Sequence, residues 1–322
     1  VHEFAGGDQV PGGAGEPLAA QVQLRAGAGG VGAADVVPAR VPLAGGRRAA
    51  TDGTGACGRA PSCGTLPRMN RVIAVANQKG GVAKTTTSVS LAAALAERGY
   101  RVLVVDLDAQ ACATFSLGLD PEELERTGAD IFLGTEDVSA LLSLIVPTAD
   151  GVDLLPASLD LAGADRALAE RRGREYCVRD ALTQVADAYD WIILDCSPSL
   201  GIMTVAALTA ADEVIVPLQC ETLSHRGVGQ LMETIADVQR LTNPRLRVAG
   251  LLPTLYDGRT AHARAVLQDL GPRYSVPVFH PISRSIRFAE APATGRSILA
   301  TAGTSKGAAD YRRLAVDLEQ AS

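Results

Sequence analysis

Residues 77–86, Asn-Gln-Lys-Gly-Gly-Val-Ala-Lys-Thr-Thr, place two glycines, two lysines and two threonines directly after a short apolar run. Glycines allow backbone N–H groups to turn toward phosphate oxygens, and the N-terminus of a following helix adds partial positive charge. The Lys84 ammonium would neutralise phosphate oxygens, and the Thr85 hydroxyl would ligate Mg²⁺. The segment therefore predicts a nucleotide phosphate site formed by Gly80, Gly81, Val82, Ala83, Lys84, Thr85 and Thr86.

From residue 71 onward, short apolar runs alternate with stretches of helical periodicity. The apolar runs are suited to buried strands, and the helical stretches to the crossover helices between them. This order predicts an α/β fold, a doubly wound and mostly parallel sheet with helices on both faces, as in P-loop NTPases. Ligands of such sheets bind at the carboxyl ends of the strands, and polar motifs follow Ala76, Val105 and Leu194. Strands are expected at 72–76, 101–106, 152–155, 191–194, 213–217 and 246–252, and helices at 85–97, 158–171, 175–188, 224–241 and 260–273.

The chain divides by composition into two parts. Residues 1–68 are rich in Gly, Ala, Pro and Arg and keep no helical or alternating periodicity. We expect this part to be a low-complexity extension that is either disordered or lies upstream of the true start at Met69. Residues 69–322 would form the ATPase domain.

Charge is distributed unevenly around a net charge of −6. Residues 69–223 hold 11 Lys and Arg against 23 Asp and Glu, whereas residues 224–322 hold 13 against 8. A basic third on an acidic body is expected where one face meets a polyanion, although an ordinary solvated surface is an equal alternative. Six scattered cysteines without a C-x-x-C pair, and no apolar run long enough to span a bilayer, indicate a cytoplasmic protein with reduced thiols.

The phosphate segment departs from the strict pattern G-x-x-x-x-G-K-[ST], because Gln78 and Ala83 stand where that pattern has glycine. Its Lys79-Gly80-Gly81-x-x-Lys84-Thr85 resembles the deviant Walker A motif of the ParA/MinD family of dimeric ATPases. The resemblance extends over nearly all of 69–322 and is greatest to the ParA/Soj chromosome-partitioning branch. It includes the segments 106–110, 192–200, 256–260 and 287–292.

The resemblance implies a role for each polar residue, with ATP and Mg²⁺ as cofactors. Lys79 would reach across an ATP-dependent homodimer to the phosphates on the other subunit, and Lys84 would bind those on its own. Asp108 would position or activate the attacking water, and Asp195 would hold Mg²⁺ through water. The alternative for Asp106 and Asp195 is a carboxylate that caps the next helix, and Asp106 in particular could be structural.

Several residues depart from the family pattern near this site. Ala83 replaces a glycine that is usual before the second lysine, where its methyl group could crowd the loop. Ala109, Ala111 and Cys112 replace the frequent Pro, Gly and Asn after the Asp-x-Asp. Ser283 stands where proline is common near the adenine, so base recognition is the least specified part of the site.

Partners are implied by the same resemblance. In ParA relatives, arginines in the helix after the Glu221 region and in the Asp-x-Arg-Thr segment face DNA, and Arg259 matches the second position. The first position, in the helix, falls on Ala236 in this chain, and Arg240 one turn later is a possible substitute. Arg226 also belongs to the basic segment 224–322. We expect non-specific DNA binding, a ParB-type stimulating protein and association with the nucleoid.

Three alternatives share the same loop. An iron–sulfur reductase needs two suitable cysteines per subunit, and the surroundings of Cys112, Cys177 and Cys220 do not match that pattern. A membrane-bound MinD-like ATPase needs a basic amphipathic C-terminal helix, but residues 311–319 end acidic and are typical of a capping helix. A ParA-like ATPase that positions a protein cargo instead of DNA remains the main competing function.

Overall fold

The computed structural model describes residues 70–221 and 224–321 of this chain. The segment 1–68, predicted to be an extension, lies outside the described residues, as do residues 222–223 and 322 and the side chains of 224–226.

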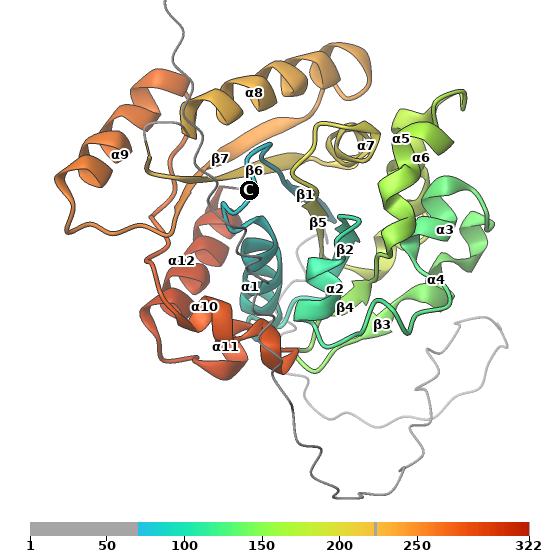
Figure 1. Cartoon of the computed structure of the whole chain (residues 1–322), viewed down its shortest axis with the longest axis horizontal. Helices are drawn as coiled ribbons and strands as arrows, with labels where there is room; N and C mark the ends of the chain where they lie inside the picture. Colours follow the sequence, from blue (N-terminus) through green and yellow to red (C-terminus); the bar gives the residue numbers. More distant parts are fainter. Residues whose placement is uncertain (1–69, 222–223, 322) are drawn as a thin grey trace, which may run out of the picture. The chain divides into compact units, whose positions relative to one another are not determined.

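Seven strands form one sheet with the order β3-β4-β2-β5-β1-β6-β7. Every neighbouring pair is parallel except β3 with β4 at one edge. The predicted doubly wound, mostly parallel sheet is confirmed (Figure 1). The strands are β1 (Arg71–Val75), β2 (Val102–Leu107), β3 (Val146–Pro147), β4 (Asp153–Leu155), β5 (Trp191–Cys196), β6 (Glu213–Gln219) and β7 (Arg247–Thr254).

Helices cover both faces of this sheet, because its central strands are buried on both sides and read as continuous apolar runs. The helices are α1 (Lys84–Glu97), α2 (Cys112–Ser116), α3 (Gly128–Leu133), α4 (Leu141–Leu144), α5 (Ala164–Ala167), α6 (Cys177–Leu182), α7 (Ile202–Ala210), α8 (Ser224–Leu241), α9 (Ala261–Tyr274), α10 (Arg287–Glu290), α11 (Ile298–Thr301) and α12 (Lys306–Gln320).

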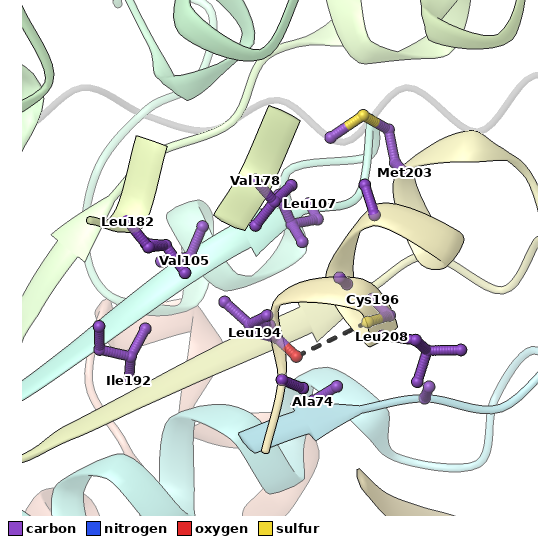
Figure 2. Close-up of a cluster of buried hydrophobic side chains, with 14 of the residues drawn as sticks. Ala74, Val105, Leu107, Val178, Leu182, Ile192, Leu194, Cys196, Met203 and Leu208 are labelled. Atoms are coloured by element: carbon purple, nitrogen blue, oxygen red, sulfur yellow. Dashed lines mark hydrogen bonds between the residues drawn. The ribbon is translucent and has the colours of Figure 1, made fainter. Parts of the chain in front are cut away.

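Two apolar clusters divide the core between the faces. Figure 2 shows part of the first, in which Val105 and Leu194 of the central strands pack with Val178 of α6 and Leu208 of α7. The second cluster lies between the opposite face of the strands and the helices α1, α11 and α12. Side chains alternate along a strand, so Asp106 and Asp195, which are direct neighbours in the β2–β5 register, face the α1 side.

The predicted helices 158–171 and 175–188 are wrong in length. The first is a 3₁₀ turn at Leu159–Gly163 followed by the single turn of α5, and the second contains only the six residues of α6 as α-helix. The helix α7 was not predicted. Its nine residues are almost entirely apolar or small and mostly buried, so they show no polar face from which helical periodicity could be recognised.

Candidate functional site

The phosphate loop joins β1 to α1 at the carboxyl edge of the sheet. The last residue before α1, Ala83, makes no side-chain capping hydrogen bond, whereas Thr260 and Ser305 cap α9 and α12 through their hydroxyl oxygens. A side chain added at Gly80 or Gly81 would meet no described atom within 4 Å. The loop therefore faces open space, and the uncapped N–H groups of α1 are free to bind an anion.

Other strands hold the loop backbone from the opposite side. The Gln219 side-chain amide donates to the Gly81 carbonyl at 2.8 Å, and the Thr254 hydroxyl donates to the Val82 carbonyl at 2.9 Å. The N–H groups of Val82 and Ala83 belong to the same two planar peptide units and so point the other way, away from these anchors. Val82 itself is buried, so its contribution to a phosphate site is confined to its backbone.

Lys84 lies beneath the loop. Its Nζ donates to the Lys79 carbonyl at 3.2 Å, and the residue is only 7% exposed. Burial lowers the pKa of Lys84, and the nearby carboxylate of Asp195 opposes that shift. The Asp195 carboxylate does not fully offset the cost of burying the Lys84 ammonium, so this site favours binding of an anion. The adjoining cleft measures about 1090 Å³ and is lined, among others, by Gly80, Gly81, Ala83, Lys84, Thr85, Thr86 and Asp108.

Thr85 and Asp195, the two predicted magnesium ligands, lie together. The Thr85 hydroxyl donates to Asp195 Oδ2 at 2.8 Å, and the Ser88 hydroxyl donates to Oδ1 at 2.8 Å. Burial, aided by the charge of Asp106, raises the pKa of Asp195 to about 7. A hydroxyl and a carboxylate at the foot of a phosphate loop are the hard oxygen donors that Mg²⁺ takes, so these residues fit a Mg²⁺–nucleotide.

Asp106 and Asp108 differ in what they do. Fully buried, Asp106 accepts from the backbone N–H groups of Asp108 and Thr114 and from the Thr114 hydroxyl. It therefore fixes the turn after β2, as the structural alternative predicted. Asp108 lines the cleft and accepts from the Gln110 N–H at 3.0 Å through Oδ1.

Lys79 lies at the edge of the loop and reaches in another direction. Its Nζ donates to Glu221 Oε2 at 2.9 Å, in the connection between β6 and α8. The structure therefore separates the two lysines: Lys84 sits under the loop, and Lys79 extends away from it.

Both alanines that replace family glycines adopt left-handed backbone. Ala83 has φ 63° and Ala111 has φ 48°, a region that costs an L-residue roughly 1–2 kcal/mol relative to glycine. The substitution at Ser283 has a different consequence. Its N–H donates to Asp310 Oδ2 at 2.8 Å, a hydrogen bond that proline could not make.

Two of the three predicted DNA-binding arginines, Arg240 and Arg259, lie near opposite ends of β7. Arg259 follows the end of β7, near the carboxyl edge, and is 89% exposed. Arg240 lies near the end of α8, which leads to the start of β7. The first and last of the eight residues of β7 are about 23 Å apart, since each step between neighbouring residues rises ~3.3 Å. Asp257 and Asp237 pair with Arg259 and Arg240 respectively. Arg226 belongs to the first turn of α8, and its side chain lies outside the described residues.

Sequence reasoning missed Ser88, which donates to Asp195, and also missed Gln219 and Thr254, which hold the loop. Ser88 lies one helical turn after Lys84, a spacing that could have suggested it. Gln219 and Thr254 end β6 and β7, more than 130 residues from the loop, and only the parallel register brings them there.

Residues 70–248 match the AAA domain family model. Sporulation initiation inhibitor protein Soj of Bacillus subtilis is 40% identical over 251 residues, which are 78% of this chain and 98% of that protein. Chromosome partitioning protein ParA of Caulobacter vibrioides is 39% identical over 249 residues, 76% of this chain and 92% of that protein. This chain belongs to the ParA/Soj family of P-loop ATPases.

Solved structures agree with this membership. Cobyrinic acid a,c-diamide synthase from Mycobacterium smegmatis, crystallised with ADP and magnesium, is 51% identical with a TM-score of 0.70. The match covers 78% of this chain and 95% of the synthase chain. The septum site-determining protein MinD of Pyrococcus horikoshii, crystallised with Mg-ADP, is 25% identical with a TM-score of 0.63. That match covers 78% of this chain and 96% of the MinD chain.

Two kinds of feature are absent from the part of the chain that the structure describes. No helix there combines the length and the apolar composition needed to cross a membrane. Nor do these residues contain a group of three or more His, Cys, Asp or Glu side chains that could hold a metal ion.

Proposed function

We propose that this ParA/Soj-family ATPase is a switch that binds ATP with Mg²⁺, dimerises in that state and then binds DNA without sequence preference. A ParB-type partner would stimulate hydrolysis and return the monomer, within chromosome or plasmid partitioning. The observation that carries this proposal is the separation of the two lysines. Lys84 is committed to its own loop, whereas the Lys79 ammonium extends away from that loop to the exposed Glu221, where a second subunit can reach it.

The residues of the site divide the work of hydrolysis. Lys84 and the uncapped start of α1 would bind the phosphates, and Lys79 would bind those of the other subunit. Thr85 and Asp195 would hold Mg²⁺, which neutralises the charge that develops on the transferred phosphoryl group. Asp108 would accept a hydrogen bond from the attacking water and orient it in line with the leaving oxygen.

Exposed apolar side chains at the mouth of the cleft support dimerisation over this face. Phe115 and Leu159 both line the cleft and are 53% and 70% exposed. Large apolar side chains at such exposure favour cover by another surface. A second copy seated over the nucleotide would bury them and bring its own Lys79 to the phosphates.

The DNA-binding surface is proposed at the carboxyl edge, around the turn 257–259. The Arg264 guanidinium donates to the carbonyls of Gly258 and Arg259, and Arg284 lies close enough to lower the pKa of Asp257 together with Arg259. Two guanidinium groups therefore act on the Asp257 carboxylate and a third, that of Arg264, is bound to the same turn, which leaves excess positive charge to meet phosphates. Arg240, at the other end of β7, is a poor candidate for the same contact.

DNA co-sedimentation with ATP, with ADP and without nucleotide tests the proposal. Random-sequence duplex should co-sediment at low salt with ATP only, because two copies of the cationic turn double the phosphate contacts. A protein that dimerises with ATP but never binds DNA would favour the cargo-positioning function. ATP binding alone does not distinguish a switch from an amide synthase, whereas nucleotide-dependent DNA affinity does.

A further inference from the structure

The Lys79 ammonium is bound by its own chain. Glu221 Oε2 accepts from Nζ at 2.9 Å, and Gln219 Oε1 lies 3.5 Å from the same nitrogen. Gln219 is the last residue of β6, and Glu221 lies in the connection that leads from β6 to α8. The side chains of Lys79 and Glu221 are 33% and 60% exposed, so a competing anion in solution or on another molecule can reach this ion pair.

Gln219 links this ion pair to the loop itself. Its amide nitrogen donates to the Gly81 carbonyl at 2.8 Å, while its amide oxygen is the one near Lys79. The first turn of α8 also lies here, since a Cβ at Gly227 would be 3.3 Å from Asn77 Oδ1 and 3.7 Å from Lys79 Cβ. The loop, the lysine and the start of α8 therefore form one contiguous group.

We propose that Glu221, supported by Gln219, is a positioning residue that holds Lys79 within its own subunit until a nucleotide on a second subunit displaces it. This inference rests on the proposed dimeric switch. A polyphosphate carries more negative charge than one carboxylate and forms stronger charge-assisted hydrogen bonds. When the protein dimerises with ATP, Lys79 would exchange its contact with Glu221 for stronger contacts with the phosphates. Without ATP there are no phosphates to replace Glu221, so Lys79 would stay paired within its own subunit.

The ion pair should oppose dimerisation by a small but measurable factor. Exposed pairs of this kind shift an equilibrium by roughly two- to fivefold each. A symmetric dimer releases two of them, so the factor is squared. Glu221→Gln, which keeps the shape of the side chain and removes its charge, should strengthen nucleotide-dependent dimerisation by roughly 4- to 25-fold.

A double-mutant cycle by sedimentation equilibrium, with a non-hydrolysable ATP analogue, measures this effect. The proteins are wild type, Glu221→Gln, Lys79→Ala and the double variant, with Glu233→Gln as a control at an exposed carboxylate on α8. Glu221→Gln should dimerise more tightly than wild type, Glu233→Gln should not, and Glu221→Gln should have no effect when Lys79 is absent. Equal or weaker dimerisation of Glu221→Gln, or the same gain without Lys79, would overturn the proposal.

Amine labelling of the nucleotide-free monomer tests the ion pair independently of dimerisation. Peptide mass spectrometry should find Lys79 labelled several-fold faster in Glu221→Gln than in wild type, with exposed Lys306 unchanged. Unchanged labelling of Lys79 overturns the proposal whatever the assembly state. Faster labelling in a protein that binds the analogue but never dimerises would support the ion pair and contradict the dimeric switch.

Discussion

The phosphate edge and the basic C-terminal third both derive from sequence patterns, but the patterns constrain geometry very differently. At the phosphate edge, ten consecutive residues and two neighbouring strands bring Lys84, Thr85 and Asp195 together. In the basic third, Arg240 and Arg259 lie at opposite ends of β7, each paired with a local carboxylate. Spacing within a motif therefore determines position, whereas the net charge of a long segment does not.

The largest expected effect is at the phosphate edge. Lys84→Ala removes the buried ammonium beneath the loop and should abolish ATP binding in calorimetry. Lys306→Ala, at the exposed start of α12, is the matched control and should bind ATP normally. An unchanged nucleotide affinity in a folded Lys84→Ala protein would refute the phosphate-loop assignment.

In the basic third, charge reversal should weaken DNA binding at Arg259 but not at Arg240. Arg259→Glu should weaken ATP-dependent binding to all duplex sequences, and should lower the slope of log affinity against log salt by about two, since a dimer loses two contacts at ~0.9 each. Arg240→Glu should change neither quantity, while both variants still dimerise. Equal losses from the two variants would place DNA along α8 instead of at the 257–259 turn.

The fold was predictable because most of its strands are short apolar runs separated by helical stretches, and six of the seven were found from sequence. The missing features have physical reasons. The helix α7 has no polar face, and β3 has only two residues. The pairing of Lys79 with Glu221 depends on the β1–β6 register, which places residues 142 positions apart side by side. Motif spacing carries no information on such contacts.

Stability should depend on pH through the two buried carboxyls. Burial raises the pKa of Asp106 to about 6 and that of Asp195 to about 7, above the unfolded value near 3.9. The folded protein therefore holds protons that the unfolded chain has lost, and this stabilisation disappears as pH rises from about 4 to 7. Urea unfolding of the nucleotide-free protein measures this effect. The free energy of unfolding should fall less from pH 5 to pH 8 in Asp195→Asn than in wild type. The same decline in both proteins would contradict this account.

The smallest effect concerns backbone strain at the phosphate edge. Ala83→Gly relieves a left-handed alanine, worth roughly 1–2 kcal/mol, and loses roughly 0.4–1 kcal/mol through the more flexible unfolded chain. Thermal unfolding should show a net gain of about 0–1.6 kcal/mol in the free energy of unfolding. Ala109→Gly, in the turn after β2 but without positive φ, should lose stability. A loss of equal size in Ala83→Gly would mean that the loop carries no such strain.

Asp108→Ala tests the central claim most directly, because it removes the water-orienting carboxylate and leaves both lysines to bind ATP. Analytical ultracentrifugation with a fluorescent random-sequence duplex at low salt measures its mass and its DNA binding in one experiment. The account predicts a stable ATP dimer that co-sediments with the duplex, and a monomer with ADP that does not. A protein that stays monomeric with bound ATP would contradict the switch, and an ATP dimer without DNA affinity would contradict the DNA-binding function.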